Sequence, residues 1–483
     1  MLEILFIVVI VAIYYTRKRK YNKSPYKAFY NLPGPIRLPI IGTTYYFLTK
    51  KVLNVAIAYM ENYGPSCIVY IPHRTYMTSV PEELKIILNH PNALDKSREY
   101  DNLIMFKNTL LVAKTNEWRK NRKLISKGFN QAVLDMFLDT FYKKSISLSK
   151  ILRNGSYNDL YYLFEKFTLD VFFEATIGIE STILEDEKEH MFVTAVTDIQ
   201  NIAFNRIGNL LKTSNFLFSF FPEAKKLTDK MNDVNNFIRQ VIKTKREQAN
   251  NESFQASGKL PVMDLLLQNS EKENLTDHYI RKEITLFAGA ATDTTAYTIG
   301  FTLCLLAMHP KIQEKVYDEI IDVVGNNGAI ECNDLSKLVY TDMAIKESQR
   351  IFPSVPLIGR QANDEIRLGD KTIPPNTGIV ISFFHLHRNP DIYPNPLEYN
   401  PDRFLPEEVA KRPNYSFLPF SGGPRNCIGL KYASMLLKTV IATVVRDFKL
   451  VTKYKSVNEL DLESHMVMRT THPLDITFIP RGN

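Results

Sequence analysis

The chain has 483 residues, of which 45% are hydrophobic and 23% are charged, close to the average for globular proteins. This composition excludes a disordered, a collagen-like or a coiled-coil chain. The net charge of +8 is concentrated near the N-terminus: residues 1–42 hold seven basic groups and one acidic group, which leaves 53 basic against 51 acidic groups in the remaining 441 residues. Because the body is nearly neutral, we expect no nucleic-acid partner.

Residues 1–16 contain an uncharged apolar run, ILFIVVIVAIYY at residues 4–15, and RKRK follows at residues 17–20. The run is shorter than the roughly 17–25 residues of most membrane-spanning helices. No small-residue cleavage site follows it, which favours an anchor over a cleaved signal peptide. Basic residues after the run, and none before it, favour a cytosolic location for the rest of the chain. We therefore predict a signal anchor at residues 1–16, with a monotopic anchor that does not fully span as the alternative.

Residues 17–42 form a basic and proline-rich hinge that ends in LPGPIRLPIIG at residues 32–42. Each proline fixes φ and disfavours helix before itself, so this segment is stiff. It is expected to hold the body at a set angle to the membrane. No repeat or flexible linker interrupts residues 43–483, which predicts one catalytic domain.

Helical patterns dominate the body, and short strand-like runs lie toward both of its ends. This distribution predicts a mainly α fold with small β-sheets (α+β). Helices are expected at residues 134–152, 157–177, 189–209, 220–249, 277–309 and 341–352. Strand-like runs lie near residues 67–76, 365–381 and 472–479. The polar stretch at residues 243–259 is expected to be a surface loop between helices.

The helix expected at residues 277–309 is largely apolar after its first two turns, and a helix that is apolar all round belongs in a core. About thirty residues at ~1.5 Å each are long enough to cross a whole domain. Asp293 and Thr294 interrupt this apolar run. A buried aspartate is rare unless it is paired or functional, so Asp293 either finds a local hydrogen bond or takes part in chemistry.

The four cysteines lie far apart and include no C-x-x-C pair, so neither a disulfide framework nor a structural zinc site is expected. Cys67, Cys304 and Cys332 are expected to be small buried residues. Cys427 differs because it lies in FSGGPRNCIG, residues 420–429. Glycines let backbone approach a flat ligand, and backbone N–H groups with the nearby Arg425 favour a thiolate that can bind a metal.

This segment matches the pattern F-x-x-G-x-R-x-C-x-G, and it resembles the haem-ligating loop of the cytochrome P450 family. Other segments agree with the family at the right positions. They are WRKNR at 118–122 (W-x-x-x-R), AATDTT at 290–295 (A-G-x-D-T-T, with Ala291 replacing the glycine), ESQR at 347–350 (E-x-x-R) and PDRF at 401–404 (P-x-R-F). The resemblance implies the cytochrome P450 fold, with a long central helix over a haem ligated by the Cys loop.

By this resemblance, Cys427 is the iron ligand and Phe420 belongs to the cofactor-binding loop. The residues implied at the haem propionates are Trp118, Arg122, Arg360 and Arg425. The cofactor is haem b, bound non-covalently, because Ala290 stands where some relatives have a glutamate that is esterified to haem. Asp293 and Thr294 are the implied catalytic residues and deliver protons during oxygen activation. Glu347, Arg350 and Arg403 are expected to form a network that holds the fold around the haem.

The resemblance implies a monooxygenase that inserts one oxygen atom from O2 into a hydrophobic substrate, which is fatty acid-like, a terpenoid or hormone, or a xenobiotic. Electrons come from NADPH through NADPH–cytochrome P450 reductase, with cytochrome b5 as an optional partner. The expected location is the endoplasmic reticulum membrane, with the catalytic domain facing the cytosol. Substrate contacts are expected from residues 102–112, 204–221, 287–291, 353–357 and 466–468. The expected reductase-docking residues are Arg119, Lys120, Lys123 and Lys127.

Two other functions remain open from the sequence. A haem-thiolate isomerase or dehydratase needs no oxygen-activating residues, and the intact Asp293–Thr294 pair argues against it. A haem-binding sensor or carrier without turnover is the second alternative, and NADPH consumption distinguishes it from an enzyme.

Overall fold

The computed structural model describes residues 16, 24–155, 157–186, 188–251 and 260–482. The predicted anchor at residues 1–16, apart from Thr16, lies outside the described residues, as do residues 17–23 of the hinge. Across the described ranges, no helix is both long enough and apolar enough to cross a membrane.

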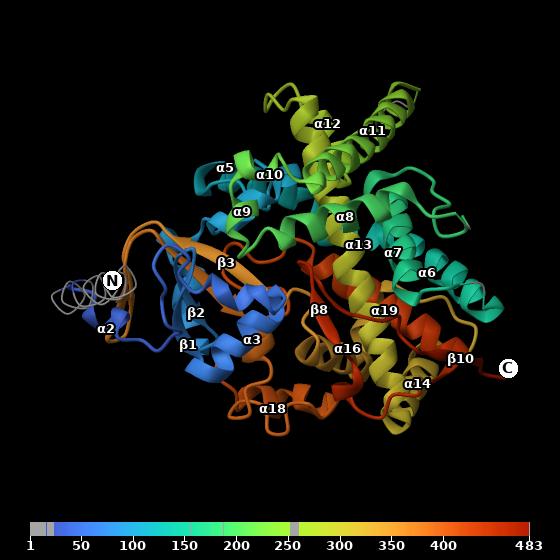
Figure 1. Cartoon of the computed structure of the whole chain (residues 1–483). Coiled ribbons are helices and arrows are strands. Elements are labelled where there is room, and N and C mark those ends of the chain that lie inside the picture. Colours follow the sequence, from blue (N-terminus) through green and yellow to red (C-terminus); the bar gives the residue numbers. More distant parts are fainter. Residues whose placement is uncertain (1–15, 17–23, 156, 187, 252–259, 483) are drawn as a thin grey trace.

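Helices form most of the molecule, the larger sheet lies on one side of it, and a smaller sheet lies near the C-terminus on the other side (Figure 1). The helices of two turns or more are α3 (Val52–Tyr63), α4 (Pro81–Asn89), α5 (Thr115–Ile125), α6 (Gln131–Asn154), α7 (Leu160–Val171), α8 (Met191–Asn205), α11 (Pro222–Asn251), α12 (Val262–Gln268), α13 (Asp277–Met308), α14 (Pro310–Val324), α16 (Val339–Ile351) and α19 (Leu430–Asp447). Shorter helices are α2 (Lys27–Tyr30), α9 (Leu210–Thr213), α10 (Asn215–Phe218), α15 (Cys332–Lys337), α17 (Phe383–Leu386) and α18 (Pro406–Ala410). The predicted mainly helical fold is confirmed.

The central element is α13, which passes through the middle of the molecule and packs against α7, α11, α16 and α19 (Figure 1). Thr276 caps its start, because the Thr276 side chain accepts a hydrogen bond from the amide of Tyr279. Nearly every residue from Ile284 to Ala307 is buried, as the apolar sequence predicts. Pro310 begins α14 directly afterwards, where a proline at the first helical position is well tolerated.

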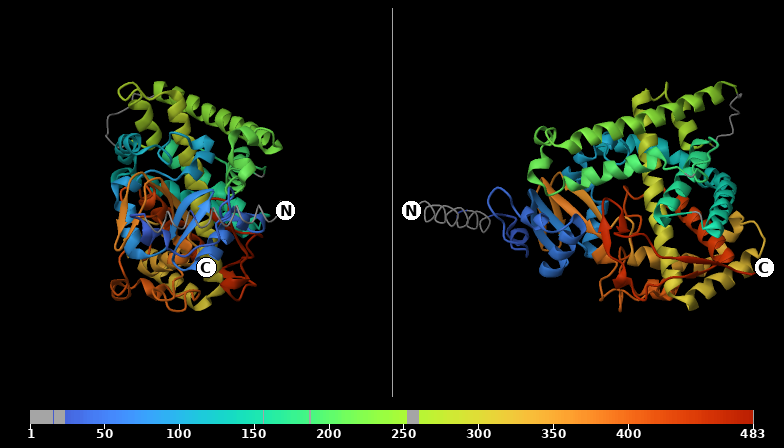
Figure 2. Two further views of the ribbon diagram at one scale, coloured as in Figure 1. Left: turned by 60° about the vertical axis from the view of Figure 1, so that its left-hand side comes forward. Right: turned by 45° about the vertical axis from the view of Figure 1, so that its right-hand side comes forward.

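The main sheet has four strands in the order β1–β2–β6–β3. Its members are β1 (Ser66–Ile71), β2 (His73–Thr78), β3 (Leu357–Ala362) and β6 (Thr377–Ser382). The β2–β6 pair is parallel and the other two pairs are antiparallel. Three two-stranded sheets complete the fold: β4 (Ile366–Leu368) with β5 (Lys371–Ile373), β7 (Phe448–Val451) with β10 (Thr477–Pro480), and β8 (Leu462–Ser464) with β9 (Met468–Thr470). Figure 2 shows the main sheet and the C-terminus on opposite sides of α13.

Two boundaries differ from the sequence-based expectation. The helix expected through residue 177 ends as α7 at Val171 and continues as a π-helical turn, Phe172–Ile177. Residues 243–249 were expected both as the end of a helix and as the start of a surface loop, and α11 stays helical to Asn251. Ion pairs explain this second difference: the Lys245 ammonium lies 3.3 Å from the Asp264 carboxylate on α12, and Arg246 pairs with Asp277 at the start of α13. Long charged side chains therefore dock the end of α11 where composition alone suggested a loop.

Candidate active site

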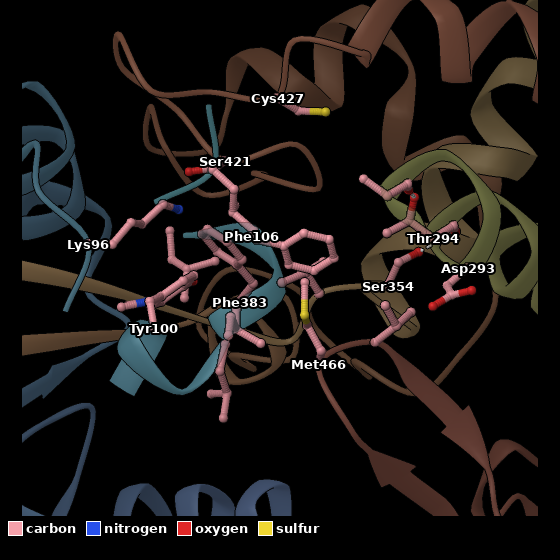
Figure 3. A pocket seen from close by; sticks show the side chains of 18 of the residues that line it. Lys96, Tyr100, Phe106, Asp293, Thr294, Ser354, Phe383, Ser421, Cys427 and Met466 are labelled. Atoms are coloured by element: carbon pink, nitrogen blue, oxygen red, sulfur yellow. Dashed lines mark hydrogen bonds between the residues drawn. The ribbon is translucent and has the colours of Figure 1, made fainter. Parts of the chain in front are cut away.

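An internal cavity of about 430 Å³ lies between α13, the loop around Cys427, and β3. Figure 3 shows Cys427 at one edge of this space, Asp293 and Thr294 at a second edge, and Lys96 and Tyr100 at a third. Phe106, Phe383 and Met466 lie between these groups. One cavity thus joins the cysteine motif to the polar pair on the central helix.

The Cys427 loop is closed by a hydrogen bond from the Cys427 amide to the Phe420 carbonyl, with an N–O distance of 3.0 Å. Gly423 has φ +69°, and a Cβ there would lie 2.1 Å from the Leu88 carbonyl oxygen, so this position requires glycine. Burial raises the pKa of the Cys427 thiol, and the Gly429 amide and Arg122 act in the opposite direction. Phe420 also lines the cavity. Of the other cysteines, Cys67 and Cys304 are buried as expected, but Cys332 at the start of α15 is exposed.

Arg425 is buried in the cavity wall and fastens two neighbouring backbone segments. Its guanidinium donates to the carbonyls of Leu94 (2.6 Å), Leu111 (3.1 Å) and Ala113 (3.0 Å), and it lies 5.0 Å from the centre of the Trp118 ring. Burial, together with repulsion from Arg360, lowers the pKa of Arg425 to about 10. Trp118 is 5% exposed and also lines the cavity.

Arg122 lines the cavity and also braces the Cys427 loop. Its two terminal nitrogens donate to the backbone carbonyl (3.0 Å) and the side-chain oxygen (2.9 Å) of Asn426. Arg360 is only 1% exposed on β3, and its one hydrogen bond among the described residues goes to the Gly359 carbonyl at 3.3 Å. A buried guanidinium without a carboxylate partner is costly, which suits a wall that faces an anion.

Two residues at this wall had not been predicted from the sequence. Lys96 and Tyr100 line the cavity, with the Lys96 ammonium 4.9 Å from the centre of the Tyr100 ring. Burial, Arg360 and Arg425 together hold the pKa of Lys96 well below its usual value. Their segment, DKSREY at residues 95–100, carries four charges in six positions, so no spacing signal separates the inward lysine from ordinary surface charge.

On α13, Asp293 and Thr294 face the cavity in different ways. Asp293 is 4% exposed, and its carboxylate accepts a hydrogen bond from the Gln200 side chain on α8. Burial raises the pKa of Asp293 to about 6. The Thr294 hydroxyl donates to the Ala290 carbonyl at 2.7 Å, while the Thr294 carbonyl accepts from the Ser354 hydroxyl at 3.1 Å. Gln200 was not predicted, because a single amide on a helix carries no motif.

The predicted network of Glu347, Arg350 and Arg403 is confirmed. Glu347 and Arg350 are fully buried and form two hydrogen bonds of 2.7 and 2.8 Å, and the Arg403 Nε lies 3.3 Å from Glu347 Oε1. Arg350 also donates to the His387 carbonyl at 2.8 Å. Burial lowers the pKa of His387 to about 3, and this neutral ring accepts a hydrogen bond from the Leu418 amide at 2.9 Å. The network therefore reaches the loop that carries Cys427.

All five segments expected to contact substrate reach the cavity, although residues 204–221 contribute only at their start, through Phe204 and Ile207. The wall is dominated by aromatic and aliphatic side chains. Those from the five segments include Leu103, Phe106, Leu110, Phe204, Ile207, Phe287, Ala290, Ala291, Val355, Leu357 and Met466. Such a wall suits an apolar molecule.

The described residues include no group of three or more His, Cys, Asp or Glu side chains that could hold a metal ion. One thiol faces a large cavity whose wall also carries Lys96, Arg360 and Arg425. A flat iron-bearing group with its own equatorial nitrogens and two carboxylates needs one axial protein ligand and nearby cations, and these residues fit it. The fold and the site thus define a haem-dependent class of protein.

Comparison with known proteins gives the family. The sequence matches the family model "Cytochrome P450" over residues 32–478. It is 30% identical to Cytochrome P450 4c3 of Drosophila melanogaster over 504 aligned positions, which cover 98% of this chain and 93% of that protein. Cytochrome P450 4c21 of Blattella germanica is 30% identical, with 93% and 92% of the two chains covered. Cytochrome P450 4g1 of Drosophila melanogaster is 27% identical, with 95% and 91% covered.

The chain therefore belongs to the cytochrome P450 family. It is an oxidoreductase of the monooxygenase type, and its cofactor is haem b.

Proposed function

We propose that this monooxygenase inserts one oxygen atom into a fatty acid-like, terpenoid or xenobiotic substrate, with electrons supplied from NADPH by NADPH–cytochrome P450 reductase. The observation that carries the proposal is that one apolar cavity among the described residues joins the Cys427 thiol to the Asp293–Thr294 pair. The predominantly hydrocarbon wall gives an apolar substrate a favourable transfer from water. When bound, haem activates O2 so that one atom enters the substrate and the other leaves as water.

Each residue then has a proposed role. Cys427 would hold the haem iron through its thiolate, whose electron density would favour oxygen activation by the bound haem. Arg360, Arg425 and the newly found Lys96 hold the propionates. Trp118 and Arg122 complete this wall, and Arg122 also fixes the Cys427 loop, as its hydrogen bonds to Asn426 support. Phe420 closes the same loop through its backbone carbonyl and lines the cavity.

On the other wall, Asp293 and Thr294 are proposed to deliver protons. With its raised pKa, Asp293 is a competent acid near neutral pH, which is the property that general acid catalysis needs. A haem-thiolate isomerase or dehydratase has no use for such an acid, so the monooxygenase remains the better supported reaction. A carrier without turnover has no use for it either.

The proposed reductase-docking surface is the exposed face of α5. Arg119, Lys123 and Lys127 are exposed there, and Lys127 lies just beyond the helix end. The Lys120 ammonium lies 3.5 Å from Glu273, so this residue is partly neutralised. Because α5 also carries Trp118 and Arg122, a partner on this face is close to the haem wall. Electrostatic attraction of this kind mainly accelerates association and weakens with salt.

A reconstituted assay tests both the reaction and the partner. With reductase, NADPH and labelled O2, we expect one labelled oxygen atom in a product from a panel of fatty acids, terpenoids and plant toxins. The double variant Lys123→Glu, Lys127→Glu is expected to slow reduction about tenfold at low salt and less at high salt. Lys311→Glu on α14 is the matched control, because Lys311 is an exposed lysine far from α5. Label derived from water contradicts the reaction, and equal reduction rates for the two charge variants contradict the docking surface.

The proposed location is the endoplasmic reticulum membrane, with the catalytic domain facing the cytosol. Beyond the apolar run of residues 4–15, two groups of exposed apolar side chains support it. Ile36, Ile40 and Leu48 are 78%, 94% and 85% exposed, and Leu211, Phe216 and Phe220 are 60%, 72% and 73% exposed. The groups are neighbours, because a Cβ at Gly208 would lie 2.4 Å from the Phe47 ring. Adjoining apolar patches of this kind suit a lipid surface.

Photo-crosslinking tests this orientation. In vesicles that contain a photoreactive lipid, we expect labelling of residues 36–48 and 208–220 as well as the N-terminal segment. The control is α14, whose exposed face is expected to stay unlabelled. Label confined to residues 1–16, or spread evenly over α14, contradicts a membrane-facing patch.

A further inference from the structure

A buried cluster of titratable groups lies behind Asp293, between α13 and α7, and the roles proposed above do not use it. Tyr297 lies four residues after Asp293 on α13 and therefore on the same helix face. Its hydroxyl donates to Glu165 Oε1 on α7 at 2.7 Å. Glu165 is 5% exposed, so it is a carboxyl group inside the protein.

A second contact fixes the position of Glu165 relative to Asp293. The Thr168 hydroxyl on α7 donates to the Thr292 carbonyl on α13 at 3.0 Å. Thr168 and Glu165 are three residues apart on one face of α7, and they contact α13 on either side of Asp293 along the chain. Asp293 thus lies beside the cavity and Gln200, with Glu165 and Tyr297 toward the interior.

The charges around the pair do not neutralise two carboxylates. The cation facing them among the described residues is Arg469 on β9, which already donates to Glu463 at 2.9 Å. Asp159, the N-cap residue of α7, adds a negative charge. Gln200 and Tyr297 contribute hydrogen bonds without charge. In such surroundings it is unfavourable for both buried carboxyl groups to be ionised at the same time.

The pKa values of the two carboxyl groups differ in the direction that this arrangement leads us to expect. Burial and the charge of Asp293 raise the pKa of Glu165 to about 8, above the value of about 6 for Asp293. The hydrogen bond from Tyr297 opposes this rise, because it stabilises the ionised form of Glu165. Near neutral pH the inner carboxyl therefore keeps a proton when the outer one has lost it.

We propose that Glu165 is a positioning residue that holds one proton for Asp293 and resupplies it after each delivery to the cavity. The inference rests on the proposed role of Asp293. The Asp293 carboxyl releases a proton toward the cavity and becomes a carboxylate. The Glu165 carboxyl then gives its proton to that carboxylate, and the Tyr297 hydroxyl stabilises the new Glu165 carboxylate. One proton taken up from bulk solvent, as hydronium that leaves water behind, then returns Glu165 to its protonated form. No electrons move in these steps.

The test compares Glu165→Gln, Asp293→Asn and Glu174→Gln in the haem-loaded enzyme with reductase. The glutamine at 165 still accepts a hydrogen bond from Tyr297 but cannot supply a proton. Glu174 is the matched control, because it follows α7 and pairs with Lys144 at 3.0 Å. We expect Asp293→Asn to lower the product formed per NADPH about 100-fold and Glu165→Gln to lower it about tenfold, with no change for Glu174→Gln.

The pH profile separates this role from a purely structural one. In the parent enzyme, product per NADPH is expected to fall only as pH rises past about 8, where Glu165 loses its proton. In Glu165→Gln the fall moves toward pH 6, the pKa of Asp293. Tyr297→Phe is expected to move it the other way, above pH 8, because the ionised form of Glu165 loses a hydrogen bond. This second variant keeps both carboxyls and so tests the proposal even where Glu165→Gln does not fold.

Infrared spectroscopy provides a readout without turnover. At pH 7 the C=O stretching bands of protonated carboxyl groups are expected to be the same in the parent and in Glu174→Gln, and to lose the contribution of one carboxyl group in Glu165→Gln, while the buried Glu283, whose pKa is raised to about 7, still contributes in all three. The inference is overturned if Asp293→Asn still lowers the product formed per NADPH, but the pH profiles and infrared bands of the variants at positions 165 and 297 match those of the parent. If Asp293→Asn has no effect, the proposed role of Asp293 fails and the inference fails with it.

Discussion

Cys427→Ala is expected to abolish product formation while the protein remains folded. Within the described structure, Cys427 supplies the one thiol on the cavity wall. Alanine leaves the hydrogen bond from residue 427 to the Phe420 carbonyl intact, because that bond uses the backbone. The loss is therefore chemical, since no other thiolate can donate electron density to the iron. Labelled-oxygen incorporation and haem content measure it.

Cys332→Ala is the matched control, because Cys332 is exposed on α15 and does not line the cavity. This variant is expected to keep the activity and haem content of the parent. Product formation by Cys427→Ala at a rate comparable to Cys332→Ala contradicts the assignment of the axial ligand.

Glu347→Ala is expected to have the largest effect on folding. The substitution leaves the Arg350 guanidinium buried without a carboxylate, and it also removes the ion-pair partner of Arg403 and the acceptor of the Asn400 amide. Breaking a buried ion pair in this way costs about 3–5 kcal/mol. Since Arg350 also holds the His387 carbonyl, the disturbance reaches Leu418 and the Cys427 loop. We expect a lower urea midpoint and weak haem retention.

Glu398→Ala provides the comparison. The Glu398 carboxylate is 57% exposed and lies 3.8 Å from Arg403, in a surface pair of the kind that contributes about 0–1 kcal/mol. Its urea midpoint is expected to stay close to that of the parent. Equal midpoints for the two glutamate variants show that the buried network does not hold the fold.

The sequence identified the elements that carry their own local pattern. The length and apolar character of residues 277–309 predicted α13, and the glycines around Cys427 predicted a loop that faces a ligand. Helical spacing allows Glu347 to pair with Arg350, because residues three apart share a face, but it was the family resemblance that predicted the network with Arg403.

Groups that meet only through the tertiary fold could not be found this way. Lys96, Gln200 and His387 are single polar residues in segments without a motif, and each becomes informative only when a distant element is placed beside it. Glu165 is the clearest case, because its partner Tyr297 is 132 residues away. Arg122 shows a related limit: the helical spacing placed it beside Trp118, but its hydrogen bonds to Asn426 depend on how the Cys427 loop packs.

The central claim is that Cys427 binds haem iron through its thiolate in an oxygen-activating site. The carbon monoxide difference spectrum of the reduced protein tests it most directly. We expect the strongly red-shifted Soret band of a thiolate-ligated ferrous haem in the parent and its loss in Cys427→Ala. Absence of that band from folded, haem-loaded parent protein, or its persistence in Cys427→Ala, contradicts the claim.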